Sequence, residues 1–149
     1  MLRVCLAVWL IVGNLLNTAG AEDRQLPIME LDIQGHVITA ELAETASART
    51  TGLMHRTHLP EDVGMFFIFP VAGIHCMWMQ NTLIPLSVAF LDESKKIINL
   101  ARMQPETLTP HCSTSAAKYA LEMNINWFDE RKIKAGDKVV TIPAKADRQ

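Results

Sequence analysis

Short apolar runs separated by turn signals most constrain the fold of this chain. Beyond residue 27 the apolar residues come in runs of strand length, such as Met65–Phe69 and Ser87–Leu91, between clusters rich in Gly, Pro, Asn and Asp. Such runs are too short for core helices, and their aromatic and β-branched residues favour strands. The pattern predicts a mainly β domain with one or two short helices. We expect an antiparallel β-sandwich or a partly closed barrel.

Local signals predict the individual elements. Residues 28–33 and 37–42 flank a Gln34-Gly35 turn and predict a hairpin. Thr45 and Gly52 are suited to cap a short helix over residues 46–51. Further strands are expected at 65–69, ended by Pro70, and at 74–79, 87–91, 96–101, 118–123 and 139–142. A helical turn is expected at 126–132, and residues 102–117 are expected to form a long surface loop.

The first 21 residues are typical of a secretory signal peptide. Arg3 precedes an apolar run from Cys5 to Leu16, and Ala19-Gly20-Ala21 has the pattern of a cleavage site. We expect cleavage after Ala21, export to the periplasm or the cell exterior, and one domain over residues 22–149 with its core at about 28–142. The alternative is an uncleaved anchor, for which the apolar run is short. No later segment is apolar enough to predict stable membrane insertion.

Charge and cysteine content narrow the choice of partners and compartment. The formal net charge is −2, and no cluster of Lys or Arg provides the basic stripe that nucleic acid or an anionic membrane surface requires. Cys76 and Cys112 remain after signal cleavage, an even pair in a compartment where disulfides persist. They are a candidate disulfide, and two separate buried thiols are the alternative.

Several segments, in a fixed order, resemble the domain of unknown function 192 family. They are Thr45–Met54 (TASARTTGLM), Pro60-Glu61-Asp62 with Gly64–Phe67, Trp78–Thr82 with Ile84-Pro85-Leu86, and Tyr119–Glu122 with Gly136-Asp137. The resemblance covers about residues 28–142. It implies a compact, jelly-roll-like β-sandwich, often behind a signal peptide, and it implies no reaction. The chain departs from the usual pattern at Gln80, where Lys is common, and at Ser87, where Asp often follows Pro-Leu.

The block from Trp78 to Pro85 is the best candidate binding site. Trp78 offers a flat ring for stacking, and Asn81 supplies donors and an acceptor where the chain turns. Arg49, on the predicted helix, is suited to hold a polar or anionic group. The candidate ligand-binding residues are Arg49, Trp78, Asn81, Thr82 and Pro85. The alternative is structural: Trp78 fills the core, and Asn81 hydrogen-bonds its own backbone.

No complete catalytic motif occurs, so catalytic residues stay unassigned and no cofactor is predicted. We expect a non-catalytic binding or interaction module for a small polar ligand, a glycan or a peptide. One alternative is an extracytoplasmic hydrolase without a recognisable motif. Another is a periplasmic copper-binding protein. If residues 74–79 form a strand, His75, Met77 and Met79 share one face, and imidazole and thioether groups suit Cu(I). Met54 and Met65 are possible further sulfur ligands.

Overall fold

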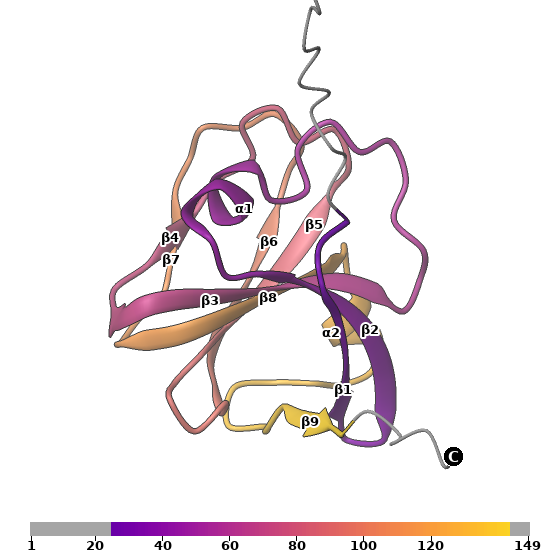
Figure 1. The fold of residues 1–149 in the computed structure, drawn as a ribbon, viewed down its shortest axis with the longest axis vertical. Coiled ribbons are helices and arrows are strands. Elements are labelled where there is room, and N and C mark those ends of the chain that lie inside the picture. Colours follow the sequence, from indigo (N-terminus) through magenta and orange to yellow (C-terminus); the bar gives the residue numbers. More distant parts are fainter. Residues whose placement is uncertain (1–24, 144–149) are drawn as a thin grey trace, which may run out of the picture.

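The structure, a computed structural model, describes residues 25–143, and the predicted signal peptide at residues 1–21 lies outside them. The described part contains nine strands and two short helices. The strands are β1 (Ile28–Ile33), β2 (His36–Ala43), β3 (Val63–Gly73), β4 (Cys76–Met77), β5 (Leu86–Leu91), β6 (Ile97–Met103), β7 (His111–Cys112), β8 (Ala117–Asn124) and β9 (Val140–Ile142), and the helices are α1 (Ala46–Thr51) and α2 (Trp127–Glu130). The predicted mainly β class with two short helices is confirmed (Figure 1).

Seven strands form one sheet in the order β6-β5-β8-β3-β2-β1-β9. All pairs are antiparallel except β2 and β3, which run parallel, so the sheet is mixed where an antiparallel one was expected. The parallel pair follows from the connection, because residues 44–62 carry α1 and return the chain to the starting end of β2. A connection of that length is what parallel neighbours require, whereas the two-residue turn after β1 allows only an antiparallel hairpin.

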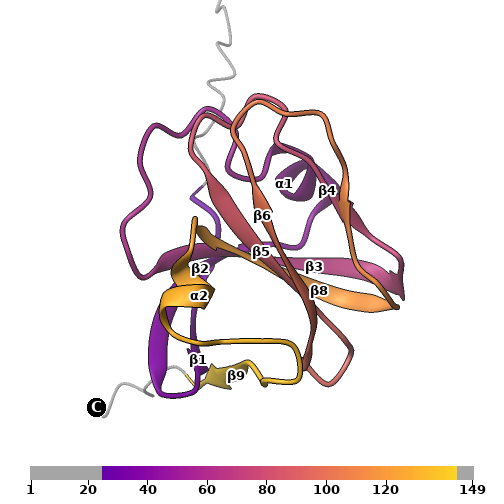
Figure 2. The same cartoon turned by 180° about the vertical axis from the view of Figure 1, so that it is seen from behind.

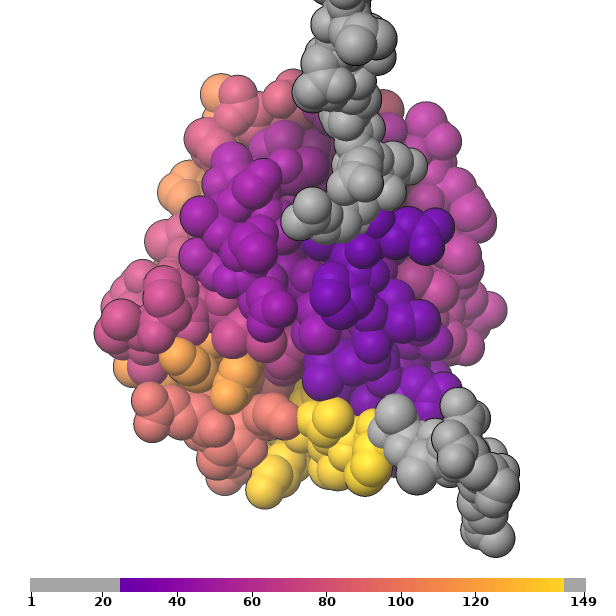
Figure 3. All heavy atoms as spheres, viewed as in Figure 1, coloured from indigo at the N-terminus to yellow at the C-terminus, as the bar shows by residue number. Residues whose placement is uncertain are grey.

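The segment before β9 joins the two ends of the sheet. Val139 N–H donates to the carbonyl of Lys95 at 3.0 Å, and Ile97 N–H donates to the carbonyl of Asp137 at 2.8 Å. The chain then continues into β9, which pairs with β1. The segment thus links the β6 edge of the sheet to the β1 edge, and the curved sheet is partly closed. A partly closed barrel was one of the expected arrangements. In Figure 3 the β1–β2 hairpin and β9 lie next to each other on one face.

The core lies on both sides of the central strands. Successive residues of β3 point to opposite faces, so Phe66 packs in one apolar cluster and Phe67 in the other. The Phe66 cluster includes Trp127 and Phe128 of α2. The Phe67 cluster lies beneath α1 and the chain around Met79. Figures 1 and 2 show α1 and α2 on opposite sides of β3 and β8.

Two strands differ in extent from expectation. β3 runs past Pro70 to Gly73, with a register shift after Ile68 that accommodates the residue lacking an N–H. The strand expected at 74–79 is reduced to β4, and β4 pairs with β7 inside the segment that was expected to be a loop. The predicted Cys76–Cys112 disulfide is present and joins directly opposed residues of this ribbon.

Candidate functional site

Segments from all four of the sequence blocks quoted above meet around one cavity. It has a volume of about 190 Å³ and lies between α1, the chain from β4 to Thr82, and the face of β3 and β8 beneath α1. We call it the Glu122 cavity. Its lining residues are Arg49, Thr50, Thr51, Gly52, Leu53, Met54, Phe67, Cys76, Met77, Trp78, Thr82 and Glu122. Segments far apart in the sequence therefore build one concave site.

Glu122 reaches this cavity because of its position on β8. Leu121 and Met123 belong to the Phe66 cluster, so the alternation of side chains places Glu122 on the opposite face, toward α1. Its partners in register are Met65 on β3 and Val88 on β5, both fully buried. Glu122 itself is only 4% exposed. A carboxyl group thus lies among apolar side chains at the inner end of the cavity.

No hydrogen bond joins the Glu122 carboxyl to another side chain or backbone group of residues 25–143. Every completely enclosed side-chain oxygen or nitrogen in that part has a hydrogen-bond partner. The unpartnered carboxyl oxygens of Glu122 are therefore open to the cavity. Burial raises the pKa of this carboxyl to about 8, because removal from water disfavours the charged form. At neutral pH Glu122 is predominantly a neutral acid that can both donate and accept a hydrogen bond.

Trp78 and Thr82 also line the cavity, Trp78 at its exposed side and Thr82 in a buried position. Trp78 is 52% exposed, which excludes the alternative that it fills the core. A half-exposed indole beside a cavity presents a flat apolar face to whatever enters. The Thr82 hydroxyl is buried and donates to the carbonyl of Gln80 at 3.3 Å, which leaves its oxygen lone pairs for an incoming donor.

Arg49 also lines the cavity, but part of its guanidinium is engaged elsewhere. Its Nη1 donates to the backbone carbonyls of Glu44 and Ile68, the latter at 3.1 Å. These two bonds fasten α1 to the chain before it and to β3. Thr45 accepts a hydrogen bond from the N–H of Ala48, as expected of the N-terminal cap. Arg49 therefore holds the helix that forms one wall.

The other two candidate binding residues do not line the cavity. Asn81 is exposed with a positive φ of 55°, and its carbonyl accepts the N–H of His55 at 2.8 Å. Pro85 is exposed, and its carbonyl accepts the N–H of Ile125. Both shape the chain on either side of Thr82. The structure thus brings Arg49, Trp78 and Thr82 together and leaves Asn81 and Pro85 outside.

The candidate copper ligands occupy three different environments. The His75 ring stacks on Phe69 at 3.7 Å, and its Nε2 lies 2.9 Å from the carbonyl oxygen of Val71. Met77 lines the Glu122 cavity, whereas Met79 is fully buried in the core. β4 covers only residues 76–77, so the alternation expected over 74–79 does not apply. Among residues 25–143, no three His, Cys, Asp or Glu side chains gather as a metal site.

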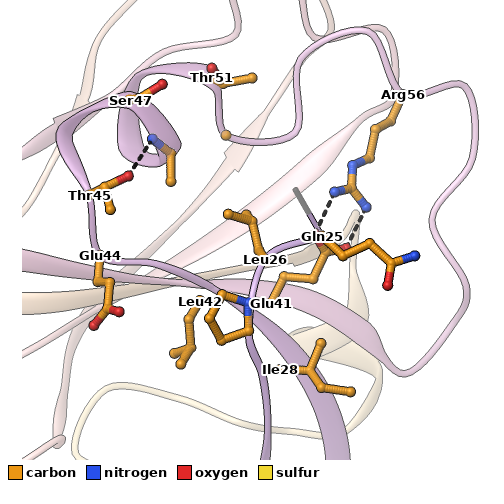
Figure 4. A pocket seen from close by; sticks show the side chains of 13 residues that line it. Gln25, Leu26, Ile28, Glu41, Leu42, Glu44, Thr45, Ser47, Thr51 and Arg56 are labelled. Atoms are coloured by element: carbon orange, nitrogen blue, oxygen red, sulfur yellow. Dashed lines mark hydrogen bonds and ion pairs between the residues drawn. The ribbon is translucent and has the colours of Figure 1, made fainter. Parts of the chain in front are cut away.

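A second and larger hollow, of about 950 Å³, lies between residues 25–28, the end of β2 and α1. Figure 4 shows Arg56 reaching across it to Glu41. The two side chains form a two-armed ion pair at 2.6 and 2.7 Å, and the hydrogen bonding to Glu41 raises the pKa of Arg56 further above its ordinary value. These charges satisfy each other, so they leave less binding capacity than the unpartnered acid of the Glu122 cavity.

Glu122 is the functional candidate that the residue-by-residue reading of the sequence missed. It lies within the Tyr119–Glu122 block of the resemblance and on the strand expected at 118–123, but it was not among the candidate site residues. A usable signal is present: Glu122 stands alone in the run Tyr-Ala-Leu-Glu-Met, where both alternating faces are otherwise apolar. A lone carboxyl in a strand buried on two faces marks a functional site more often than a surface charge does.

The fold and the site define a mainly β domain with a small cavity that has a buried acid at its inner end. The chain belongs to the domain of unknown function 192 (DUF192) family, described as "Uncharacterized ACR", whose model matches residues 29–141. This confirms the resemblance seen in the sequence. No curated protein matches the chain.

Two solved structures share the fold. One, from Sinorhizobium meliloti, is described as a proposed transcription regulator; it is 27% identical with a TM-score of 0.76, covering 78% of this chain and 95% of that one. The other, from Novosphingobium aromaticivorans, is a protein of unknown function; it is 34% identical with a TM-score of 0.74, covering 76% of this chain and 85% of that one.

Proposed function

We propose that this protein is a non-catalytic binding module that takes a small polar ligand in the Glu122 cavity. The observation that carries the proposal is the buried, unpartnered Glu122 carboxyl, which opens into a cavity beside the half-exposed ring of Trp78. A buried polar group without a protein partner costs free energy unless something else satisfies it. A ligand group or a water molecule in the cavity would do so.

The size of the cavity supports a small ligand or one unit of a larger one. Pockets for drug-sized molecules measure about 300–1,000 Å³, whereas this cavity measures about 190 Å³. A single ring or side chain fits such a volume. The apolar walls formed by Met54, Phe67 and Met77 leave Glu122, Thr82 and Arg49 to fix its orientation.

An exported protein is part of the proposal. The sequence of residues 1–21 is typical of a signal peptide, and the Cys76–Cys112 disulfide fits an oxidising compartment. None of the described helices is long and apolar enough to cross a membrane. Intact mass of the secreted protein tests the export: loss of residues 1–21 supports it, and their retention contradicts cleavage.

A hydrolase is the second candidate, and one observation favours it. Glu122 has the raised pKa that a general acid needs near neutral pH. Hydrolysis also needs a base that activates water or a hydroxyl nucleophile, and among the described lining residues Glu122 is the only carboxyl group and there is no histidine. Trp78 beside an isolated acid is therefore better suited to binding than to bond cleavage.

The test is a ligand screen of residues 22–149 by saturation-transfer NMR, with monosaccharides, amino acids and short peptides. We expect hits that disappear in Trp78→Ala and persist in Val37→Ala. Val37 is a matched control because it is 51% exposed and lies at the β1–β2 hairpin, outside the cavity. Hits that are equally strong in both variants would contradict the proposal.

A further inference from the structure

The Glu122 cavity combines two features that a sugar ring matches. Trp78 places a half-exposed aromatic ring beside the cavity, and Glu122 offers a buried hydrogen-bonding group without a protein partner. A sugar ring has an apolar face of C–H groups and a rim of hydroxyls that both donate and accept. The neutral acid also donates and accepts, so it can bond to two ring hydroxyls at once. Building on the proposed function, we propose that the cavity binds one neutral sugar ring, stacked on Trp78 and held by Glu122 and Thr82.

Neutrality of the ligand follows from the surroundings of Glu122. Its neighbours on the sheet are Met65 and Val88, and Phe67 lines the same cavity. The same apolar environment that keeps the acid uncharged also penalises a charged ligand group placed against it. Arg49 is the only charged side chain among the described lining residues, and its Nη1 is bonded to two backbone carbonyls. The inner end of the cavity therefore selects hydroxyl groups over ammonium or carboxylate groups.

The volume limits the ligand to one ring. About 190 Å³ has room for a single six-membered sugar, and the opening at Trp78 lets that sugar be free or the end of a longer glycan. The two sources share the chemistry of the bound ring. Only a glycan has further sugar units that extend out of the cavity past Trp78. A comparison of the affinities for the free sugar and for an oligosaccharide therefore distinguishes the two sources.

The experiment is calorimetric titration of residues 22–149 with neutral monosaccharides and their oligosaccharides, and with amino-sugar and uronic-acid counterparts. We expect neutral sugars to bind. The affinity of the charged counterparts should be at least about tenfold lower, which corresponds to a loss of about 1.4 kcal/mol of binding free energy. If an oligosaccharide binds more tightly than its terminal sugar, the natural ligand is the end of a glycan. If the two bind equally, the natural ligand is the free sugar.

Variants assign the binding to these residues. Trp78→Ala and Glu122→Leu should each weaken binding at least about tenfold, while Glu122→Gln, which keeps a donor and an acceptor, should stay within about fivefold. Melting curves identify a variant that does not fold, and Glu122→Gln and Trp78→Ala remain informative if Glu122→Leu fails. Ligands that need Trp78 and Glu122 but are not sugars would overturn this inference and leave the proposed function standing. Ligand binding that ignores both residues would overturn both.

Discussion

Replacement of Glu122 by glutamine should change how the stability of the protein depends on pH. The ordinary pKa of a glutamate, 4.5, is raised to about 8 in the folded protein by burial. Between these values the native state holds a proton that the unfolded chain has lost. The free energy of unfolding therefore falls as pH rises, by about 1.4 kcal/mol per unit, and most of this contribution is gone once pH passes the folded pKa. From pH 5 to pH 7 the wild type should lose about 2.5 kcal/mol through Glu122 alone.

Urea unfolding of residues 22–149 at pH 5, 6, 7 and 8, with the disulfide intact, measures this effect. Glu122→Gln stays neutral, so the difference between wild type and variant isolates the Glu122 contribution from the titration of other groups. The variant should gain stability relative to wild type as pH rises. Glu30→Gln, at an exposed position on β1, is the matched control and should follow the wild-type profile. Parallel profiles for wild type and Glu122→Gln would refute a buried neutral acid.

Three further variants test the framework of the site. Arg49→Met should lower the free energy of unfolding by about 1.5–3 kcal/mol in urea titrations, because α1 loses charged donors to two carbonyls, and an unchanged midpoint would contradict this role. Gly64→Ala should cost about 1–3 kcal/mol, because the added Cβ would overlap the carbonyl oxygen of Glu122; wild-type melting would disprove that close approach. Replacing Cys76 and Cys112 by serine opens a link across 36 residues and should cost about 4 kcal/mol by the chain-entropy estimate, and equal stability with and without the bond would argue against it.

Local signals predict much of the fold. The Gln34-Gly35 turn takes positive φ values of 55° and 87°, as a two-residue hairpin requires, and the hairpin forms as expected. Thr45 caps α1 through its side chain, and Gly52 ends the helix with a φ of 49°. These features depend on residues close in sequence, so the sequence alone specifies them.

Features that depend on distant segments were not predictable in the same way. The parallel pairing of β2 with β3 depends on the route of residues 44–62, and no pattern within either strand encodes it. β4 and β7 are two residues each and exist through mutual pairing. Their local sequences carry too little periodicity to identify a strand.

The same distinction between local signals and contacts of distant segments applies to the residues of the candidate site. Trp78 was identified from its residue type and its place in a turn-rich block, and Arg49 from its place on the expected helix. Glu122 was not identified from the sequence, because its burial depends on α1 covering the second face of β8. This covering arises only when segments that are distant in the sequence pack together. The chemistry of a strand residue depends on whether its face is covered, and alternation alone shows one covered face.

The two indole N–H resonances of residues 22–149 test the central claim most directly. Trp78 lines the cavity, whereas Trp127 is buried on the other side of the sheet and donates its indole N–H to Asp62 at 3.0 Å. When a ligand from the screen is titrated into ¹⁵N-labelled protein, the Trp78 indole signal should shift together with the amides of Thr82 and Glu122, and the Trp127 signal should stay in place. A bound ligand that leaves the Trp78 and Glu122 signals unmoved would show that the Glu122 cavity is not the binding site.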